Sequence, residues 1–274
     1  MAAVVPDVAV SPVAANAWSA QFAERWNVGR NQNGGVLLSA VSVALAACAG
    51  QPHPIAVTGY YLRPTEAGDA VVRTALVKQG RTYSTAAGQL WQDDRERLQV
   101  TGCFGDLARR PGEEPVPYAE PPSAPRPEAC HDLFQILAAG PAGVKALTRS
   151  LQNFEIRVDP SCGWGADQAG RPSLSGWVRF RDADTVSASM LIAAADGFPP
   201  TVMSGMQIRW LPTVELTVHL FGLPVPDEPW LQASLRTCTV ASGLLDEDGE
   251  LWDASGRLVA RFRQLAMILP RGRG

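Results

Sequence analysis

The chain has 274 residues, 46% of them apolar and 19% charged, so it can bury the core of one large domain or of two ordinary ones. A net charge of −3 argues against a nucleic-acid-binding surface, and the longest apolar run, 36–49, is too short to span a bilayer. The N-terminal segment has no basic region of a secretory signal, so we expect a cytoplasmic protein. Five scattered cysteines and three histidines predict reduced thiols and no metal site.

The first predicted helix spans about 34–49, in the stretch "RWNVGRNQNGGVLLSAVSVALAAC". Its polar entrance contains Gly34 and Gly35, which have no side chains to keep another group away from the first backbone amides. Those amides lack partners within the helix and lie at its partially positive end. The stretch is therefore either a simple turn and helix cap, or a set of N–H donors for a substrate oxygen.

Four strand-like runs follow this helix, namely "IAVTGYYL", "DAVVRTALVKQG", "TYSTAAGQLWQ" and "RLQVTGCFG". The next segment, 109–130, carries seven prolines between Pro111 and Pro127, which excludes a regular helix or a central strand. We interpret it as an extended linker between an N-terminal unit, 1–108, and a C-terminal unit, 131–274.

The C-terminal unit repeats the order of the first. A small-residue helix is predicted over about 184–196, in "TVSASMLIAAADGFPP", and strand-like runs again follow it. The closest local similarity is between "RTYSTAAG" at 81–88 and "RTCTVASG" at 236–243, each before a turn rich in acidic residues. One helix followed by several antiparallel strands, present twice, predicts an α+β double hotdog, with two central helices each wrapped by an antiparallel sheet.

Several stretches together resemble the double-hotdog acyl-CoA thioesterases, a group that includes the type II medium-chain enzymes. They are "WNVGRNQNGGVLLSAV", "YYLRP", "GRTYST" and the final "GRLVARFRQLAMIL". The resemblance covers nearly the whole chain and implies hydrolysis of a fatty acyl-CoA to a free fatty acid and coenzyme A, without a cofactor. It implies an acyl-CoA substrate as the partner, with neither nucleic acid nor a membrane span; a homo-oligomer stays open.

The resemblance also implies a catalytic set of a carboxylate, a hydroxyl and a glutamine. Matched residue by residue, these fall on Glu215, on Thr237 with Thr239 as second choice, and on Gln264. The family has Asp where this match places Glu215, and one extra methylene shifts a carboxylate enough to cost about 10²-fold in rate.

In this hypothesis Glu215 activates a water, Gln264 and the threonine hold it, and Gly34 and Gly35 donate to the thioester oxygen. Arg63 and Arg81 are candidates for the phosphates of coenzyme A. Each residue also has an ordinary interpretation: a surface Glu215, a Gln264 bonded to a neighbouring strand, and arginines in surface ion pairs.

Two other functions compete with hydrolysis. A hotdog hydratase or dehydratase needs an Asp and a His acting together, as in D-x-N-P-x-H, and the sequence contains no such motif. A non-catalytic acyl-CoA- or lipid-binding protein would keep the fold while its site changed, and the Glu215 departure keeps that alternative open.

Overall fold

The computed structural model describes residues 2–108, 119–138, 148–161, 171–204 and 211–269. Residues 109–118 of the predicted linker lie outside the described residues. The described part is dominated by one 14-stranded sheet in which all paired strands are antiparallel. Within that part, no helix has the length and apolar character needed to cross a membrane.

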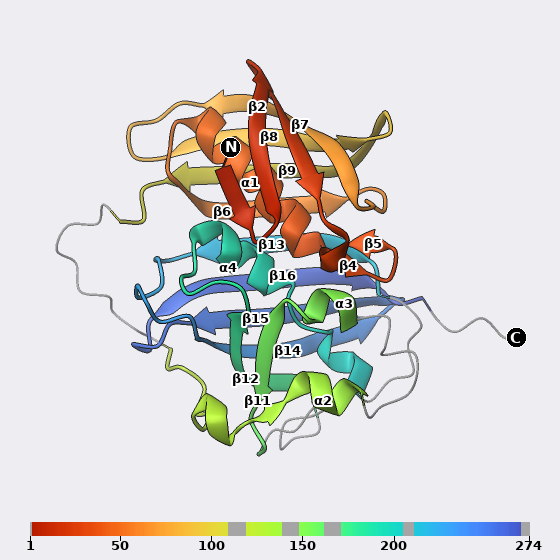
Figure 1. The fold of residues 1–274 in the computed structure, drawn as a ribbon, viewed down its shortest axis with the longest axis vertical. Helices are drawn as coiled ribbons and strands as arrows, with labels where there is room; N and C mark the ends of the chain where they lie inside the picture. Colours follow the sequence, from red (N-terminus) through yellow and green to blue (C-terminus); the bar gives the residue numbers. More distant parts are fainter. Residues whose placement is uncertain (1, 109–118, 139–147, 162–170, 205–210, 270–274) are drawn as a thin grey trace, which may run out of the picture.

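The N-terminal half contributes seven strands of this sheet (Figure 1). They are β1 (Ala2–Val5), β2 (Val8–Ala14), β3 (Ala17–Phe22), β6 (His53–Tyr61), β7 (Gly68–Lys78), β8 (Ser84–Gln92) and β9 (Arg95–Gly105). The short strands β4 (Asn27–Val28) and β5 (Asn31–Gln32) pair separately, just before the first helix.

The C-terminal half contributes the other seven strands. They are β10 (His131–Asp132), β11 (Phe154–Val158), β12 (Ser173–Phe180), β13 (Thr213–Leu220), β14 (Leu231–Ala241), β15 (Leu244–Trp252) and β16 (Leu258–Met267). The halves join where β6 pairs with β13, with Val57 opposite Val218, so one continuous sheet crosses the molecule.

Helix α1 (Gly34–Ala49) confirms the first predicted helix, and twelve of its 16 residues are buried. A helix that is apolar on all sides is stable only when it is enclosed. Accordingly α1 contacts strands β6, β7, β8 and β9 and also helix α4. Gly50 ends it in the left-handed conformation, with φ of 63°, which glycine adopts without strain.

Helix α4 (Ala188–Ala195) is shorter than the predicted 184–196 because Ser187 caps its first turn and Asp196 already has a non-helical ψ of 22°. It packs against α1, β13 and β15. The Ser39 hydroxyl donates to the Ser189 carbonyl at 2.6 Å, directly between the two helices. Small side chains on both helices therefore bring the two halves into close contact.

Two short helices, α2 (Leu133–Ala138) and α3 (Thr148–Leu151), lie in the C-terminal half, and α3 contacts β4 across the boundary between the halves. The strand-like runs of the sequence predict β6–β9 and β13–β16, but they do not predict β1–β3, β11 or β12. These additional strands extend both ends of the sheet.

Candidate active site

A pocket of about 370 Å³ lies where the start of α1 meets the end of α4 and the ends of β13 and β16. Its walls come from both halves of the chain. Apolar side chains form much of the lining, and the polar residues include Asn33, Tyr61, Thr65, Asp196, Thr213 and Gln264. A largely apolar concave site with a few convergent polar groups is typical of a binding site for a small molecule.

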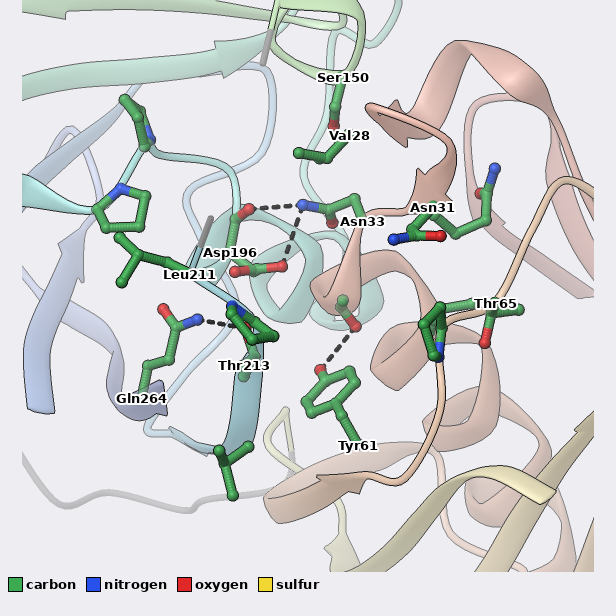
Figure 2. A pocket seen from close by; sticks show the side chains of 18 of the residues that line it. Val28, Asn31, Asn33, Tyr61, Thr65, Ser150, Asp196, Leu211, Thr213 and Gln264 are labelled. Atoms are coloured by element: carbon green, nitrogen blue, oxygen red, sulfur yellow. Dashed lines mark hydrogen bonds between the residues drawn. The ribbon is translucent and has the colours of Figure 1, made fainter. Parts of the chain in front are cut away.

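Asp196 ends helix α4 and points at the start of α1 (Figure 2). Its Oδ2 accepts hydrogen bonds from the Gly35 amide at 2.9 Å and from Asn33 Nδ2 at 3.1 Å. Asn33 Nδ2 also donates to the Asp196 carbonyl at 2.7 Å, while Asn33 Oδ1 caps α1 by accepting from the Val36 amide. Asn33 therefore joins its own helix to the end of the other.

Two opposing effects set the acidity of Asp196. Burial raises the pKa of its carboxyl from 3.8 to about 6, and hydrogen bonds from the Gly35 and Gly34 amides hold it from rising further. A carboxylate at the C-terminal end of its own helix is electrostatically unfavourable, but the positive end of α1 compensates for this. Asp196 is therefore a buried carboxyl group whose pKa lies well above the ordinary aspartate value, as is common at functional sites.

Gly34 and Gly35 explain how Asp196 approaches the start of helix α1 so closely. A Cβ on Gly35 would lie 2.8 Å from the Asp196 Cβ and 2.9 Å from the Ala193 carbonyl oxygen. A Cβ on Gly34 would lie 3.0 Å from Asp196 Oδ2 and 3.0 Å from the Tyr61 ring. The absence of side chains thus lets the helix start receive a carboxylate of this same chain.

Thr213 and Gln264 form a second polar pair in the pocket, with Gln264 Nε2 donating to Thr213 Oγ1. A bulge in β13 between Thr213 and Glu215 positions this pair. Beyond the bulge, the buried Leu216 pairs with Gln264, so both face the core. Figure 2 shows the Asp196 carboxylate facing the Thr213–Gln264 pair.

Tyr61 lies between the two walls of the pocket, and its hydroxyl donates to the Gly34 carbonyl at 2.8 Å. Burial is the main cause that raises the pKa of this phenol, and the negative charges of Asp196 and Glu215 raise it further. Tyr61 therefore stays protonated and holds the first turn of α1 in place.

The structure places the predicted carboxylate Glu215 on the opposite side of the sheet from Gln264. In the β13–β16 register, Glu215 pairs with Leu265 whereas Leu216 pairs with Gln264, and alternate residues face opposite sides. Glu215 accepts a hydrogen bond from Thr217 and lines a separate, charged depression with His219. The predicted grouping of Glu215 with Gln264 around one water is therefore not present.

The other predicted residues are divided between several places. Thr237 is buried in a cluster with Thr201 and Glu247, and Thr239 is exposed at the end of β14. Arg63 is exposed at the pocket and donates to the Glu96 carbonyl, whereas Arg81 is exposed in the turn between β7 and β8.

The glycines also differ from their predicted role. Gly34 lines the pocket, but the amide of Gly35 donates to Asp196, so this N–H has a protein carboxylate as its partner instead of a thioester oxygen.

Comparison with known proteins decides the family. The model of the acyl-CoA thioesterase N-terminal domain matches residues 22–105, and that of the acyl-CoA thioesterase C-terminal domain matches residues 121–268. The chain belongs to the acyl-CoA thioesterase family. An uncharacterized Mycobacterium tuberculosis protein is 26% identical to this family member over 275 residues, which cover 93% of this chain and 92% of that protein.

Solved structures agree with the family assignment. A thioesterase II candidate from Thermobifida fusca superposes with a TM-score of 0.83 and 28% identity, covering 97% of this chain and all of that one (100%). A hot dog fold protein of unknown function from Alicyclobacillus acidocaldarius has a TM-score of 0.76 at 20% identity, with coverage of 95% and 96%. The dehydratase domain of RzxB from Pseudomonas fluorescens is more distant, with a TM-score of 0.55, 14% identity and coverage of 93% and 94%. This family member therefore has the hotdog fold.

Sequence reasoning missed Asp196, Thr213, Asn33 and Tyr61 as site residues. One signal was present: "AAADGFPP" puts an acidic residue at the C-terminal end of an apolar helix, where the helix dipole disfavours it. Thr213 lies only two residues before Glu215, but the bulge that brings it to the pocket has no signature in the sequence.

Proposed function

We propose that this protein hydrolyses fatty acyl-CoA thioesters, with Asp196 as the general base and with Thr213 and Gln264 holding the attacking water. The observation that carries the proposal is the position of the buried Asp196 carboxyl, held by the Gly35 amide, in a pocket that also contains the Thr213–Gln264 pair. Burial there raises the pKa of Asp196 to about 6. A base with a pKa near the working pH is ionised and still accepts a proton effectively.

The proposed reaction needs few groups. The Asp196 carboxylate takes a proton from the water while the water oxygen bonds to the thioester carbonyl carbon. The resulting tetrahedral intermediate then collapses, the carbon–sulfur bond breaks, and coenzyme A leaves as a thiolate that is subsequently protonated. One N–H of Gln264 donates to Thr213, and we assign its second N–H to the water or to the thioester oxygen.

Each half of the chain has a distinct part in this proposal. We infer that 1–108 and 131–274 are two hotdog units with α1 and α4 as their central helices, and that 109–130 links them. The N-terminal unit supplies the helix start that stabilises Asp196, and the C-terminal unit supplies the base and the water-holding pair. Arg63, exposed at the pocket, is our candidate for contact with a phosphate of coenzyme A.

The positions of the histidines argue against a dehydratase. His53 accepts a hydrogen bond from the Leu107 amide, His131 is exposed in β10, and His219 lines the separate depression beside Glu215. None of the three lines the pocket that contains Asp196. The distant similarity to a dehydratase domain therefore supports the fold and not that chemistry.

A comparison of two carboxylates tests the proposal. Thiol release from acyl-CoAs with chains of about two, eight and sixteen carbons is measured for the wild type, Asp196→Asn and Glu215→Gln. We expect kcat to fall by about 10²-fold or more in Asp196→Asn, and Glu215→Gln to stay within about twofold of the wild type.

The possible results separate the alternatives. A wild-type protein that binds these acyl-CoAs but releases no thiol would support the non-catalytic binding protein instead. Loss of turnover in Glu215→Gln with full activity in Asp196→Asn would overturn the assignment of the base.

A further inference from the structure

The wall of the pocket opposite the proposed catalytic residues contains two buried polar side chains with unmatched hydrogen-bonding atoms. Gln32 is 5% exposed and Thr65 is 1% exposed, and both line the pocket. Gln32 Oε1 and Thr65 Oγ1 have no hydrogen-bond partner among the described residues. Buried polar atoms are nearly always paired, so two such atoms in one wall of a pocket require an explanation.

The two side chains are neighbours and are held in place by the backbone. The Gln32 amide donates to the Thr65 carbonyl at 2.8 Å, which joins the end of β5 to the segment after β6. In Figure 2, Thr65 and Asn31 lie on one side of the pocket, Asp196, Thr213 and Gln264 lie on the other, and Tyr61 stands between them. A molecule that reaches the proposed catalytic residues can thus extend along this second wall.

The orientation of the Gln32 amide follows from its partners. Its Nε2 donates to the Ala23 carbonyl at 3.0 Å, and a backbone carbonyl can only accept. Nε2 also donates to Asn27 Oδ1, so both N–H groups of Gln32 are used. The remaining Oε1 can only accept a hydrogen bond, whereas the Thr65 hydroxyl can donate or accept.

An acceptor next to a hydroxyl matches a secondary amide, which offers one N–H and one carbonyl. We propose that Gln32 and Thr65 form a subsite that binds a secondary amide of the pantetheine arm of coenzyme A. Gln32 Oε1 accepts from the amide N–H, and the Thr65 hydroxyl donates to the amide carbonyl. This inference rests on the proposed function, because it takes the arm that carries the thioester as the ligand.

Three thioesters of the same acyl chain test the subsite: the coenzyme A thioester, the N-acetylcysteamine thioester, which keeps one amide, and the S-ethyl thioester, which has none. Thr65→Val keeps the shape of the side chain and removes its hydroxyl. We expect kcat/KM of this variant to fall by about two- to tenfold for the coenzyme A thioester and to be unchanged for the S-ethyl thioester. If kcat/KM of Thr65→Val also falls for the N-acetylcysteamine thioester, the subsite binds the amide nearer the sulfur.

Two variants serve as controls. Thr65→Ser restores a hydroxyl and should restore kcat/KM for the coenzyme A thioester. Thr74 is also a buried threonine (6% exposed) whose Oγ1 has no partner among the described residues, but it is in β7 and does not line this pocket. Thr74→Val should therefore leave kcat/KM unchanged for all three thioesters.

The result that overturns the subsite is an equal loss for the amide-bearing and the amide-free thioesters, or no loss for any of them. Calorimetric titration with pantetheine separates failure of the subsite from failure of the proposed function. If the wild type hydrolyses no thioester yet binds pantetheine more tightly than Thr65→Val does, the hydrolase proposal fails and the amide subsite stands. If hydrolysis is normal and both proteins bind pantetheine equally, the subsite alone fails.

Discussion

The amide of Gly35 donates a 2.9 Å hydrogen bond to Asp196 Oδ2, and this contact joins the start of helix α1 to the end of helix α4. The two residues are 161 positions apart in the sequence. The contact orients the proposed base and moderates its pKa, so the site exists only where the two halves of the chain meet.

Gly35→Ala should disrupt both the fold and the site. Its Cβ would lie 2.8 Å from the Asp196 Cβ and 2.9 Å from the Ala193 carbonyl oxygen, and neither atom can move unless the backbone at the end of α4 shifts. We expect a loss of about 1–3 kcal/mol in the free energy of unfolding, measured by denaturant titration, together with a reduced kcat. Gly222→Ala is the control, because a Cβ there meets no atom within 4 Å. Equal stability of the two variants would contradict the close approach of Asp196 to α1.

The pH dependence of activity should follow the ionisation of Asp196. Because the general base must be ionised, kcat/KM should rise with pH through about 6 and then level off. Steady-state rates from about pH 4 to about pH 9 would show this limb. A profile that is already level at the ordinary aspartate pKa of 3.8 would exclude Asp196 as the group that controls the rate.

The unfolding free energy should fall with pH over the range in which kcat/KM rises, because the same ionisation of Asp196 is involved. Burial raises the folded-state pKa of Asp196 above 3.8, so its contribution to stability is full at low pH and is lost as pH rises through about 6. Asp196→Asn cannot ionise, so its unfolding free energy should increase relative to the wild type across this window. Denaturant titrations at several pH values check this, and a difference that is constant with pH would count against a raised pKa.

Thr213 and Gln264 should act as one unit. Thr213→Val and Gln264→Ala are each expected to lower kcat by roughly tenfold to a hundredfold, because they position the water without activating it. The double variant should lose less than the product of the two single losses, since the pair is joined by a hydrogen bond. Thr217→Val is the control on the same strand, because Thr217 lies beside Glu215 in the separate depression. Fully multiplicative losses would show that the pair does not work together.

Glu247 and Thr237 should matter for stability more than for chemistry. The buried Glu247 accepts from the Thr201 amide and hydroxyl, both at 2.7 Å, and its burial raises the pKa of its carboxyl. Glu247→Ala should cost about 2–3 kcal/mol of unfolding free energy because it leaves buried donors without this acceptor. Glu250 is on the same strand as Glu247 and forms a surface ion pair with Arg261 of β16. Glu250→Ala should therefore cost less than about 1 kcal/mol of unfolding free energy.

Thr237→Val provides the matching kinetic measurement. Thr237 contacts Thr201 at 2.8 Å and does not line the pocket, so kcat should stay within about threefold of the wild type. A hundredfold loss would return Thr237 to the catalytic role that the family resemblance implied.

Local patterns in the sequence determined the elements that hold the site. The apolar run after Gly34 and Gly35 predicted α1, because a helix that is apolar on all sides must be buried. Alternating strands separated by turns predicted β6–β9 and β13–β16. Gln264 was proposed from the family resemblance of the final strand. These features depend only on residues close together in the chain.

The tertiary structure alone decided which polar groups share the pocket. A bulge in β13 places Thr213 beside Gln264, and the strand register puts Glu215 on the other face, where a shift of one residue would exchange the two faces. Asp196 becomes a candidate base only when the end of α4 meets the amides of α1 from the other half of the chain. Burial then raises its pKa, and burial depends on the packing of both halves, which no local pattern records.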